Sequence, residues 1–146
     1  VSEAFINHIL RKGKKDRARK IMQDALDHIN GLVPGISPLE ALAIAVDKAA
    51  PLVKTSGSKR GAKTILTPTP LTQRQRFRLG CVWIIESANP GYGKERAGTL
   101  GQRIGQEVVN VINGQSNILQ RKAQVHKTAL ANRSNIAMTD RRIIRR

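Results

Sequence analysis

The sequence predicts a mainly α-helical protein: a six-helix, bundle-like domain with a β-hairpin arm that protrudes between the third and fourth helices. Three observations predict it. Apolar residues recur at intervals of three and four along most of the chain, as they do on the buried face of a helix. One stretch, residues 52–71, instead favours extended backbone. The 146 residues suffice for one core but not for two. We therefore expect one domain over residues 1–134, followed by a basic C-terminal extension over residues 135–146.

Three helices are predicted before the arm. Residues 5–10 have helical apolar spacing and indicate a short first helix. A second, strongly amphipathic helix should begin with Asp16 as its N-cap and end at Gly31. The third should begin at residues 37–40, Ser-Pro-Leu-Glu, where serine can cap, proline suits the first helical position and glutamate completes a capping box. Pro51 should end this helix.

The arm is predicted from residues 52–71. Threonine and valine flank a basic centre that contains glycine, which is typical of a β-hairpin. Pro68 and Pro70 lack amide donors, so we expect them at a sheet edge or beyond the pairing. The stretch has few apolar residues and should project from the helical body. The cations at its tip suit a finger laid along a groove or strand of nucleic acid, with a mobile charged loop as the alternative: Lys59, Arg60 and Lys63.

Three helices are predicted after the arm. Thr72 should cap the fourth, which runs to about Ala88. The fifth is expected over residues 94–113 and the sixth, capped by Asn117, to about Asn132. Glycine costs a helix up to ~1 kcal/mol relative to alanine. Close packing against a neighbouring helix should therefore compensate for the glycines on one face of the fifth helix, which are Gly98, Gly101 and Gly105.

The charge of the chain predicts a polyanionic partner. Lys and Arg number 26 against 10 Asp and Glu, so the formal net charge is +16. No acid lies between Lys48 and Ile85, or between Val108 and Thr139. The excess positive charges repel one another, and proteins of this kind usually offset that repulsion by binding phosphate groups. A positive face without a dedicated partner is one alternative. An anionic membrane surface is less favoured, because aromatic anchors make up only 3% of residues.

No catalytic or metal-binding constellation is apparent. The three histidines are scattered, and the single thiol, Cys81, can form neither an internal disulfide nor a thiolate zinc site. Residues 91–94, Gly-Tyr-Gly-Lys, lack the preceding strand and the following hydroxyl residue of a nucleotide-binding loop. No apolar run approaches the ~20 residues of a membrane span. We expect no enzyme activity, no cofactor, no metal, no small-molecule substrate and no membrane partner.

The remaining candidate sites are basic. Residues 11–15, Arg-Lys-Gly-Lys-Lys, place four cations at a helix junction, where amides of the next helix can join them around a phosphate. Arg74, Arg76 and Arg78 do not share one helix face and should fan out at the base of the hairpin. Cations dispersed over loops, hairpin and helix starts suit folded RNA better than a duplex-reading helix. The alternative is an architectural, histone-like DNA-binding protein.

Four stretches in order resemble one known family over essentially the whole chain. They are residues 5–15, 38–51, 83–88 and 126–133, which read FINHILRKGKK, PLEALAIAVDKAAP, WIIESA and HKTALANR. The chain resembles the small-subunit ribosomal protein S-seven family. The resemblance implies six helices with a hairpin arm, a protein that binds the 3′ domain of small-subunit ribosomal RNA, and nucleation of the subunit head. It also implies an arm near the exit-site tRNA and the mRNA exit path, with head and platform proteins as neighbours.

The resemblance extends to individual residues. The residues expected to hold ribosomal RNA are Arg11, Lys12, Lys14, Lys15, Arg74, Arg76, Arg78, Lys94, Arg121, Lys122, His126, Lys127, Asn132 and Arg133. The sequence departs from the bacterial pattern at the hairpin tip, at Val82, at Ala123, Gln124 and Leu130, and in its basic end. These departures favour a mitochondrial member, placed in the matrix, over one of the bacterial cytoplasm.

Overall fold

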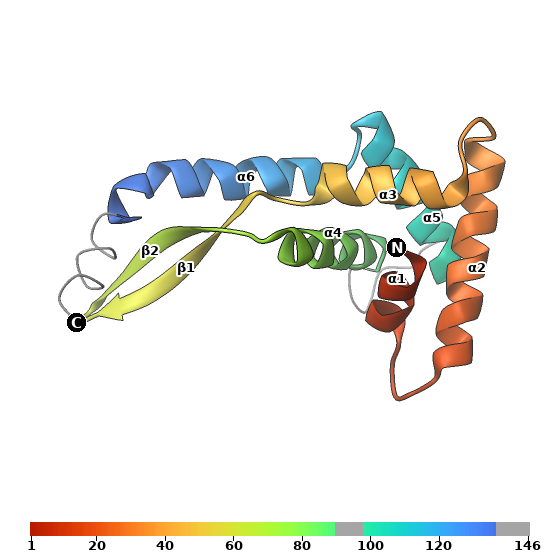
Figure 1. The fold of residues 1–146 in the computed structure, drawn as a ribbon, viewed down its shortest axis with the longest axis horizontal. Coiled ribbons are helices and arrows are strands. Elements are labelled where there is room, and N and C mark those ends of the chain that lie inside the picture. The colour runs from red at the N-terminus through yellow and green to blue at the C-terminus, as the bar shows by residue number, and fades with distance from the viewer. Residues whose placement is uncertain (90–97, 137–146) are drawn as a thin grey trace.

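The computed structural model describes residues 1–89 and 98–136, and within them it confirms the predicted fold (Figure 1). Six α-helices and one antiparallel hairpin follow in the expected order, with the hairpin between the third and fourth helices. The helices are α1 (Ser2–Ile9), α2 (Lys15–Leu32), α3 (Pro38–Ala49), α4 (Gln73–Ala88), α5 (Leu100–Asn113) and α6 (Asn117–Ala131). The strands are β1 (Val53–Arg60) and β2 (Lys63–Pro70), and a 3-10 helix, η1 (Arg133–Asn135), follows α6.

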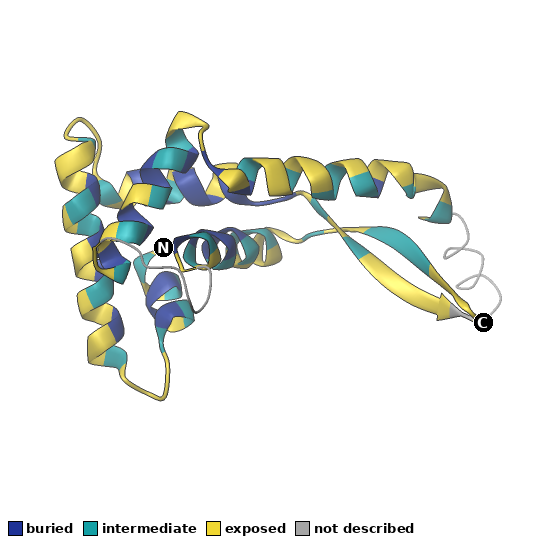
Figure 2. Ribbon diagram, turned by 180° about the vertical axis from the view of Figure 1, so that it is seen from behind, coloured by how far each residue is buried: buried dark blue, intermediate teal, exposed yellow. Residues whose placement is uncertain are grey.

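An aliphatic core joins the helices into one body. Figure 2 shows the buried residues gathered where α1 to α5 face one another, while the hairpin is mostly exposed. Phe5 is the largest of the completely buried side chains, and because the chain has few aromatic residues, aliphatic side chains provide most of the remaining packing. The large side chains that are completely buried include Ile29, Leu42, Ile84, Ile104, Val108 and Val111.

The glycines of α5 allow it to approach α2 closely, as the sequence predicts. A Cβ atom on Gly101 would lie 2.6 Å from the carbonyl oxygen of Ile21. One on Gly105 would lie 2.9 Å from the carbonyl oxygen of Ala25. Such distances leave no room for a methyl group, so the two backbones pack in direct contact. This contact fixes α5, and with it the end of α4, against the helix that carries the basic turn.

Two predicted helix starts are wrong in detail. Asp16 does not cap α2: Lys14 is the N-cap, and the Asp16 carboxylate accepts a bond from Arg19 Nη1 at 3.2 Å within the first turn, where the helix dipole also favours an acid. This helix also continues through Gly31 to Leu32. Ser37 does occupy the N-cap of α3, with Pro38 after it. Its side chain makes no cap bond, so the predicted capping box with Glu40 does not form.

The fifth helix begins later than predicted. Gly98 has a φ of +81°, which is incompatible with a continuous helix from Lys94. The helix instead begins at Leu100 through a capping box, in which Thr99 Oγ1 accepts from the Gln102 amide and the Gln102 side chain accepts from the Thr99 amide. Gly98 therefore belongs to the approach to the helix and not to its packing face. Lys94 itself lies outside the described residues.

The other two predicted caps differ in outcome. Thr72 caps α4 as expected, and Gln75 completes a capping box with it. The cap of α6 is Ser116 and not Asn117, because Ser116 Oγ accepts from the Ile118 amide at 3.1 Å. The Ser116 hydroxyl also bonds to the Glu107 carboxylate, which accepts from Ser87 Oγ at 2.9 Å. This half-buried carboxylate ties the start of α6 to α4 and α5.

The arm is a regular two-residue hairpin. Arg60 pairs with Lys63 across Gly61 and Ala62, and the φ of +57° at Gly61 alone is the pattern of a type II′ turn. Counting outward from this closing pair, Pro68 and Pro70 pair with β1 at positions that are not hydrogen-bonded, where a strand amide points away from its partner. Both prolines therefore lie within the pairing on its open side, which agrees with the expected edge position.

The base of the arm does not stand free, because α6 lies beside it (Figure 1). The Leu52 amide donates to Nε2 of His126 at 3.0 Å. Beyond the helix, Asn135 Nδ2 donates to the Leu66 carbonyl oxygen at 2.8 Å on the open edge of β2. The arm thus projects from the helical body with one side supported along its base. The rest of the predicted C-terminal extension, residues 137–146, lies outside the described residues.

Candidate nucleic-acid interface

The predicted basic run forms a tight turn between α1 and α2. Lys12 and Gly13 both have positive φ, at 52° and 72°, and the Lys14 amide donates to the Arg11 carbonyl oxygen at 3.2 Å. Two consecutive residues of this kind define a type I′ turn. A lysine in the left-handed region costs on the order of 1 kcal/mol, so the body of the protein must hold the turn in place. The turn displays exposed Arg11, Lys12 and Lys14 on one short loop.

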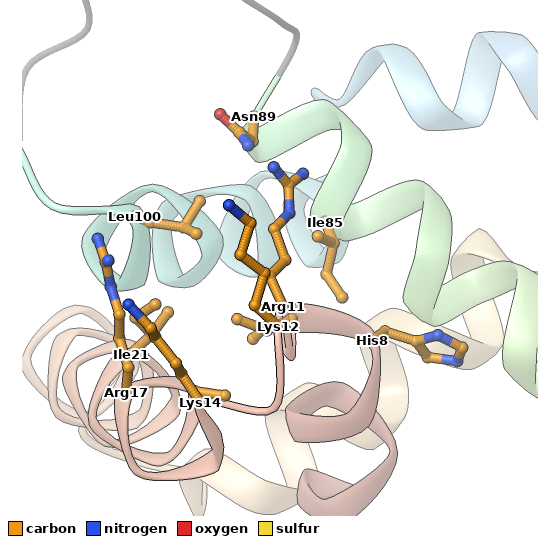
Figure 3. A pocket seen from close by; sticks show the side chains of 11 residues that line it. His8, Arg11, Lys12, Lys14, Arg17, Ile21, Ile85, Asn89 and Leu100 are labelled. Atoms are coloured by element: carbon orange, nitrogen blue, oxygen red, sulfur yellow. The ribbon is translucent and has the colours of Figure 1, made fainter.

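Beside this turn lies a hollow of about 550 Å³, which we call the basic hollow. Figure 3 shows Arg11 and Lys12 extending over one part of it, with Lys14 and Arg17 on the other side of Leu100. Among the residues that the structure describes, no carboxylate lines it. Its lining residues are His8, Ile9, Arg11, Lys12, Lys14, Arg17, Ala18, Ile21, Ile85, Asn89 and Leu100.

Sequence reasoning missed Arg17 as a candidate. It follows Lys14 by three residues, a spacing that places both on one side of the first turn of α2. That spacing is the signal in the sequence that identifies Arg17, since it places a second cation beside Lys14 on the polar side of the helix. In the described part of the chain, Arg11, Lys12, Lys14 and Arg17 enter none of the salt bridges. Their charges are therefore available to an external anion.

Lys15 differs from its neighbours in the run. Its Nζ lies 3.1 Å from the Glu3 carboxylate of α1, and both side chains are substantially exposed. An exposed pair of this kind contributes little to stability and is screened by salt. The structure therefore separates the four predicted cations into three at the hollow and one paired across the turn.

The three arginines at the start of α4 do not converge. Arg74 and Arg78 are exposed. Arg76 is directed toward the body, where Nη2 lies 3.4 Å from the Asp47 carboxylate and Nη1 donates to Gln73 at 3.1 Å. Its Nε is buried and has no hydrogen-bond partner among the described residues. Two of the three predicted cations are thus displayed at the base of the arm, and the third joins α4 to α3.

Several candidates on α6 already have partners within the protein. Arg121 bonds to the Glu86 carboxylate at 2.9 Å and lies over the Trp83 ring, 4.6 Å from its centroid. Lys122 Nζ donates to the Lys48 carbonyl oxygen at 2.8 Å, and burial lowers the pKa of this ammonium, although nearby Asp47 opposes the shift. Lysine and arginine at such positions cap the carbonyl end of a helix or stack on a ring as readily as they bind phosphate.

The end of α6 is more open. The Nε2 atom of His126 accepts a hydrogen bond from the Leu52 amide. Asn132 Nδ2 donates to the Thr128 carbonyl oxygen at 2.8 Å. Lys127 and Arg133 are exposed, and they enter no salt bridge of the described residues. Lys127 in α6 and Arg133 in η1 are therefore the candidates of this region best placed to meet an external phosphate.

The hairpin tip presents exposed Lys59 and Lys63, and it lies at the opposite end of the molecule from the turn between α1 and α2 (Figure 1). The backbone of Arg60 closes the turn opposite Lys63. The exposed candidate cations thus fall on three parts of the molecule: the basic hollow, the hairpin tip, and the base of the arm, where α4 begins and α6 ends. A partner that meets all three must be large and irregular.

The described residues contain no group of three or more side chains that could hold a metal ion. None of their helices is long and apolar enough to cross a bilayer. Cys81 is completely buried, and desolvation raises the pKa of its thiol to about 11, so this thiol is a packing residue and not an activated nucleophile.

Comparison with known proteins identifies one family. A profile described as "Ribosomal protein S7p/S5e" matches residues 1–133. The small ribosomal subunit protein uS7 of Francisella philomiragia is 31% identical over 130 residues, which cover 89% of this chain and 80% of the relative. The protein of the same name from Francisella tularensis subsp. novicida is 29% identical over the same shares of both chains.

Proposed function

Because the chain belongs to the ribosomal protein S7p/S5e family, we propose that it binds the 3′ domain of small-subunit ribosomal RNA and nucleates assembly of the subunit head. Membership makes it a structural protein of the small ribosomal subunit. The basic hollow supports the RNA-binding part of the proposal, because four cations line it and no acid of the described residues does. The family match gives no support to the alternative of a histone-like DNA-binding protein.

The physical basis of the proposed binding is phosphate neutralisation. Each lysine or arginine placed on a phosphate releases a condensed counterion, which gives affinity without reading a base. Specificity would then come from the spacing of three rigid basic surfaces, since only an RNA of matching shape can meet all of them. The packing of Gly101 against Ile21 and the network around Glu107 keep those surfaces in a fixed relation.

We also propose that the arm lies near the exit-site tRNA and the mRNA exit path. The exposed cations Lys59 and Lys63, with Arg60 between them in sequence, support a contact with a nucleic-acid strand at the tip. The support of α6 along the base allows the arm to hold its direction without a partner. Substituting all three cations with alanine should weaken tRNA retention at the exit site and leave binding of the isolated 3′-domain RNA nearly unchanged.

Neighbouring head and platform proteins are the proposed protein partners. An apolar groove of about 310 Å³ lies between α6 and the base of the arm. Leu52 and Leu130 on its sides are 55% and 66% exposed, which is unusual for leucine beside other apolar groups. A Leu130→Asp substitution should leave RNA affinity intact and reduce incorporation of a neighbouring protein during reconstitution of the small subunit.

The compartment is proposed from sequence divergence. The departures from the bacterial pattern at Val82, Ala123 and Gln124 support a mitochondrial ribosome, whereas the relatives compared above are bacterial. Fractionation of cells followed by detection of the chain tests this proposal. Recovery with cytoplasmic ribosomes alone would contradict it.

Competition between two polyanions tests the RNA proposal. The purified chain is bound to labelled 3′-domain RNA and challenged, at fixed salt, with unlabelled RNA or with duplex DNA of equal phosphate content. We expect the RNA to compete far better, because duplex DNA can satisfy charge but not shape. Equal competition by both would remove the ribosomal interpretation and restore the DNA-binding one.

A further inference from the structure

The basic hollow has a lining that phosphate binding alone does not explain. Its rim carries Arg11, Lys12, Lys14 and Arg17, which suit phosphates. Its interior, however, is formed by aliphatic side chains from four helices, which gain nothing from contact with an anion. These are Ile9, Ala18, Ile21, Ile85 and Leu100.

From this pairing of rim and interior we infer that the hollow takes one unstacked nucleotide of the bound RNA, an inference that rests on the proposed function. The phosphates of that nucleotide lie between the cations, and its base lies on the aliphatic side chains. Ile21, Ile85 and Leu100 are only half-buried in the chain alone, so a planar base would complete their burial. The volume of about 550 Å³ falls within the ~300–1,000 Å³ of pockets that hold whole ligands.

Paired nucleotides cannot use this site. Bases in an RNA helix are stacked and the narrow major groove hides their edges, so a base can reach an aliphatic pocket only from a bulge, loop or junction. The hollow therefore selects an unpaired nucleotide of the RNA and does not only attract phosphate charge.

Two side chains at the rim can orient the base. The Asn89 carboxamide offers two donors and an acceptor at the end of α4, while its backbone amide is already bonded to Ile85 and Glu86. Figure 3 shows the Arg11 guanidinium extending toward Asn89, and a guanidinium plane can stack on a base. His8 points away from this group in the same view, so its ring is not the platform.

The test uses the full chain and two RNA duplexes that differ only by one unpaired central nucleotide, carrying 2-aminopurine. Binding of the bulged duplex should be about tenfold tighter than binding of the paired one. The 2-aminopurine emission should rise on binding, because a base on aliphatic groups is released from quenching by stacked neighbours. A Leu100→Ser variant should reduce the preference toward unity. Its matched control is Leu39→Ser, which changes an exposed leucine in the first turn of α3, remote from the hollow.

Each outcome is decisive. A preference that Leu100→Ser removes and Leu39→Ser retains supports the inference, provided that circular dichroism shows both variants folded. Equal, salt-sensitive affinity for both duplexes overturns the inference and leaves the proposed RNA binding standing. A preference unaffected by Leu100→Ser also overturns it. Failure to bind either duplex or the 3′-domain RNA would instead refute the proposed function.

Discussion

Replacing Lys12 and Lys14 together with alanine should flatten the salt dependence of RNA binding. Both ammonium groups are exposed at the basic hollow and enter no salt bridge of the described residues. Each phosphate contact contributes about 0.7 to 0.9 to the slope of log affinity against log salt, so the double variant should lose about 1.4 to 1.8. Over a fourfold change in salt, that difference corresponds to about a sevenfold to twelvefold change in relative affinity.

The matched control removes two other lysines whose ammonium groups have partners in the protein. Lys48 Nζ donates to the Ile112 carbonyl oxygen at 2.9 Å, and Lys122 Nζ donates to the Lys48 carbonyl oxygen at 2.8 Å. A Lys48→Ala, Lys122→Ala chain has the same net charge as the first variant. Its slope should change much less, and its stability should fall by about 1 kcal/mol for each lost bond.

Filter binding of 3′-domain RNA over a series of salt concentrations measures both slopes. The sequence alone places Lys122 among the RNA-binding residues, whereas the structure gives its ammonium an internal partner, so this comparison decides between the two expectations. Equal losses of slope in the two variants would show that net charge, and not placement at the hollow, governs binding. An unchanged slope in the Lys12, Lys14 variant would refute phosphate contact at the turn.

Three further predictions concern the body that holds these surfaces in place. A Gly101→Ala substitution puts a methyl group 2.6 Å from the Ile21 carbonyl oxygen, so urea unfolding should show the fold destabilised by about 1–3 kcal/mol. Gly31 has open space around it, and Gly31→Ala should therefore stabilise α2 by about 0.5–1 kcal/mol in the same measurement. The same sign for both would contradict the close approach of α2 and α5. Thr72→Ala should cost about 1 kcal/mol through loss of the α4 cap, and a Thr72→Ser chain should recover most of it. Because burial raises the pKa of the Cys81 thiol, thiol reagents at neutral pH should label the folded chain slowly and the urea-unfolded chain rapidly. Rapid labelling of the folded chain would show the thiol to be accessible.

Local patterns predicted most of the fold because they carry their own physical cause. The hairpin follows from β-favouring residues around a glycine turn, and the cap at Thr72 follows from the hydroxyl and Gln75 three residues later. The packing of Gly101 was predictable because glycine in a helix needs a compensating contact. The hairpin and the cap depend on residues close together in sequence, whereas the glycine predicts a close contact but not the helix that makes it.

Competition between nearby groups made other predictions fail. The carboxylate of Asp16 bonds to Arg19 and not to the helix amides, and Ser116 takes the cap of α6 because Glu107 also binds its hydroxyl. A single sequence does not show which of two adjacent polar residues meets such a partner. The error at the start of α5 has a local cause, since Thr99 and Gln102 form a capping box that could have been recognised.

The candidate site was predictable in its charge but not in its shape. The run at residues 11–15 identified the basic turn, yet the aliphatic interior of the hollow depends on Ile85 and Leu100, which come from α4 and α5. Their meeting is a result of tertiary packing. For the same reason the sequence could not distinguish Lys14, which is available, from Lys15, which pairs with Glu3.

Photocrosslinking within purified small subunits shows whether the basic turn contacts ribosomal RNA. The subunits are irradiated, the RNA is digested, and peptides that carry nucleotides are identified by mass spectrometry. We expect the peptide spanning Arg11 to Arg17 to crosslink to the 3′ domain of the small-subunit ribosomal RNA. Crosslinks from other parts of this chain, with the basic turn consistently free of RNA, would contradict it.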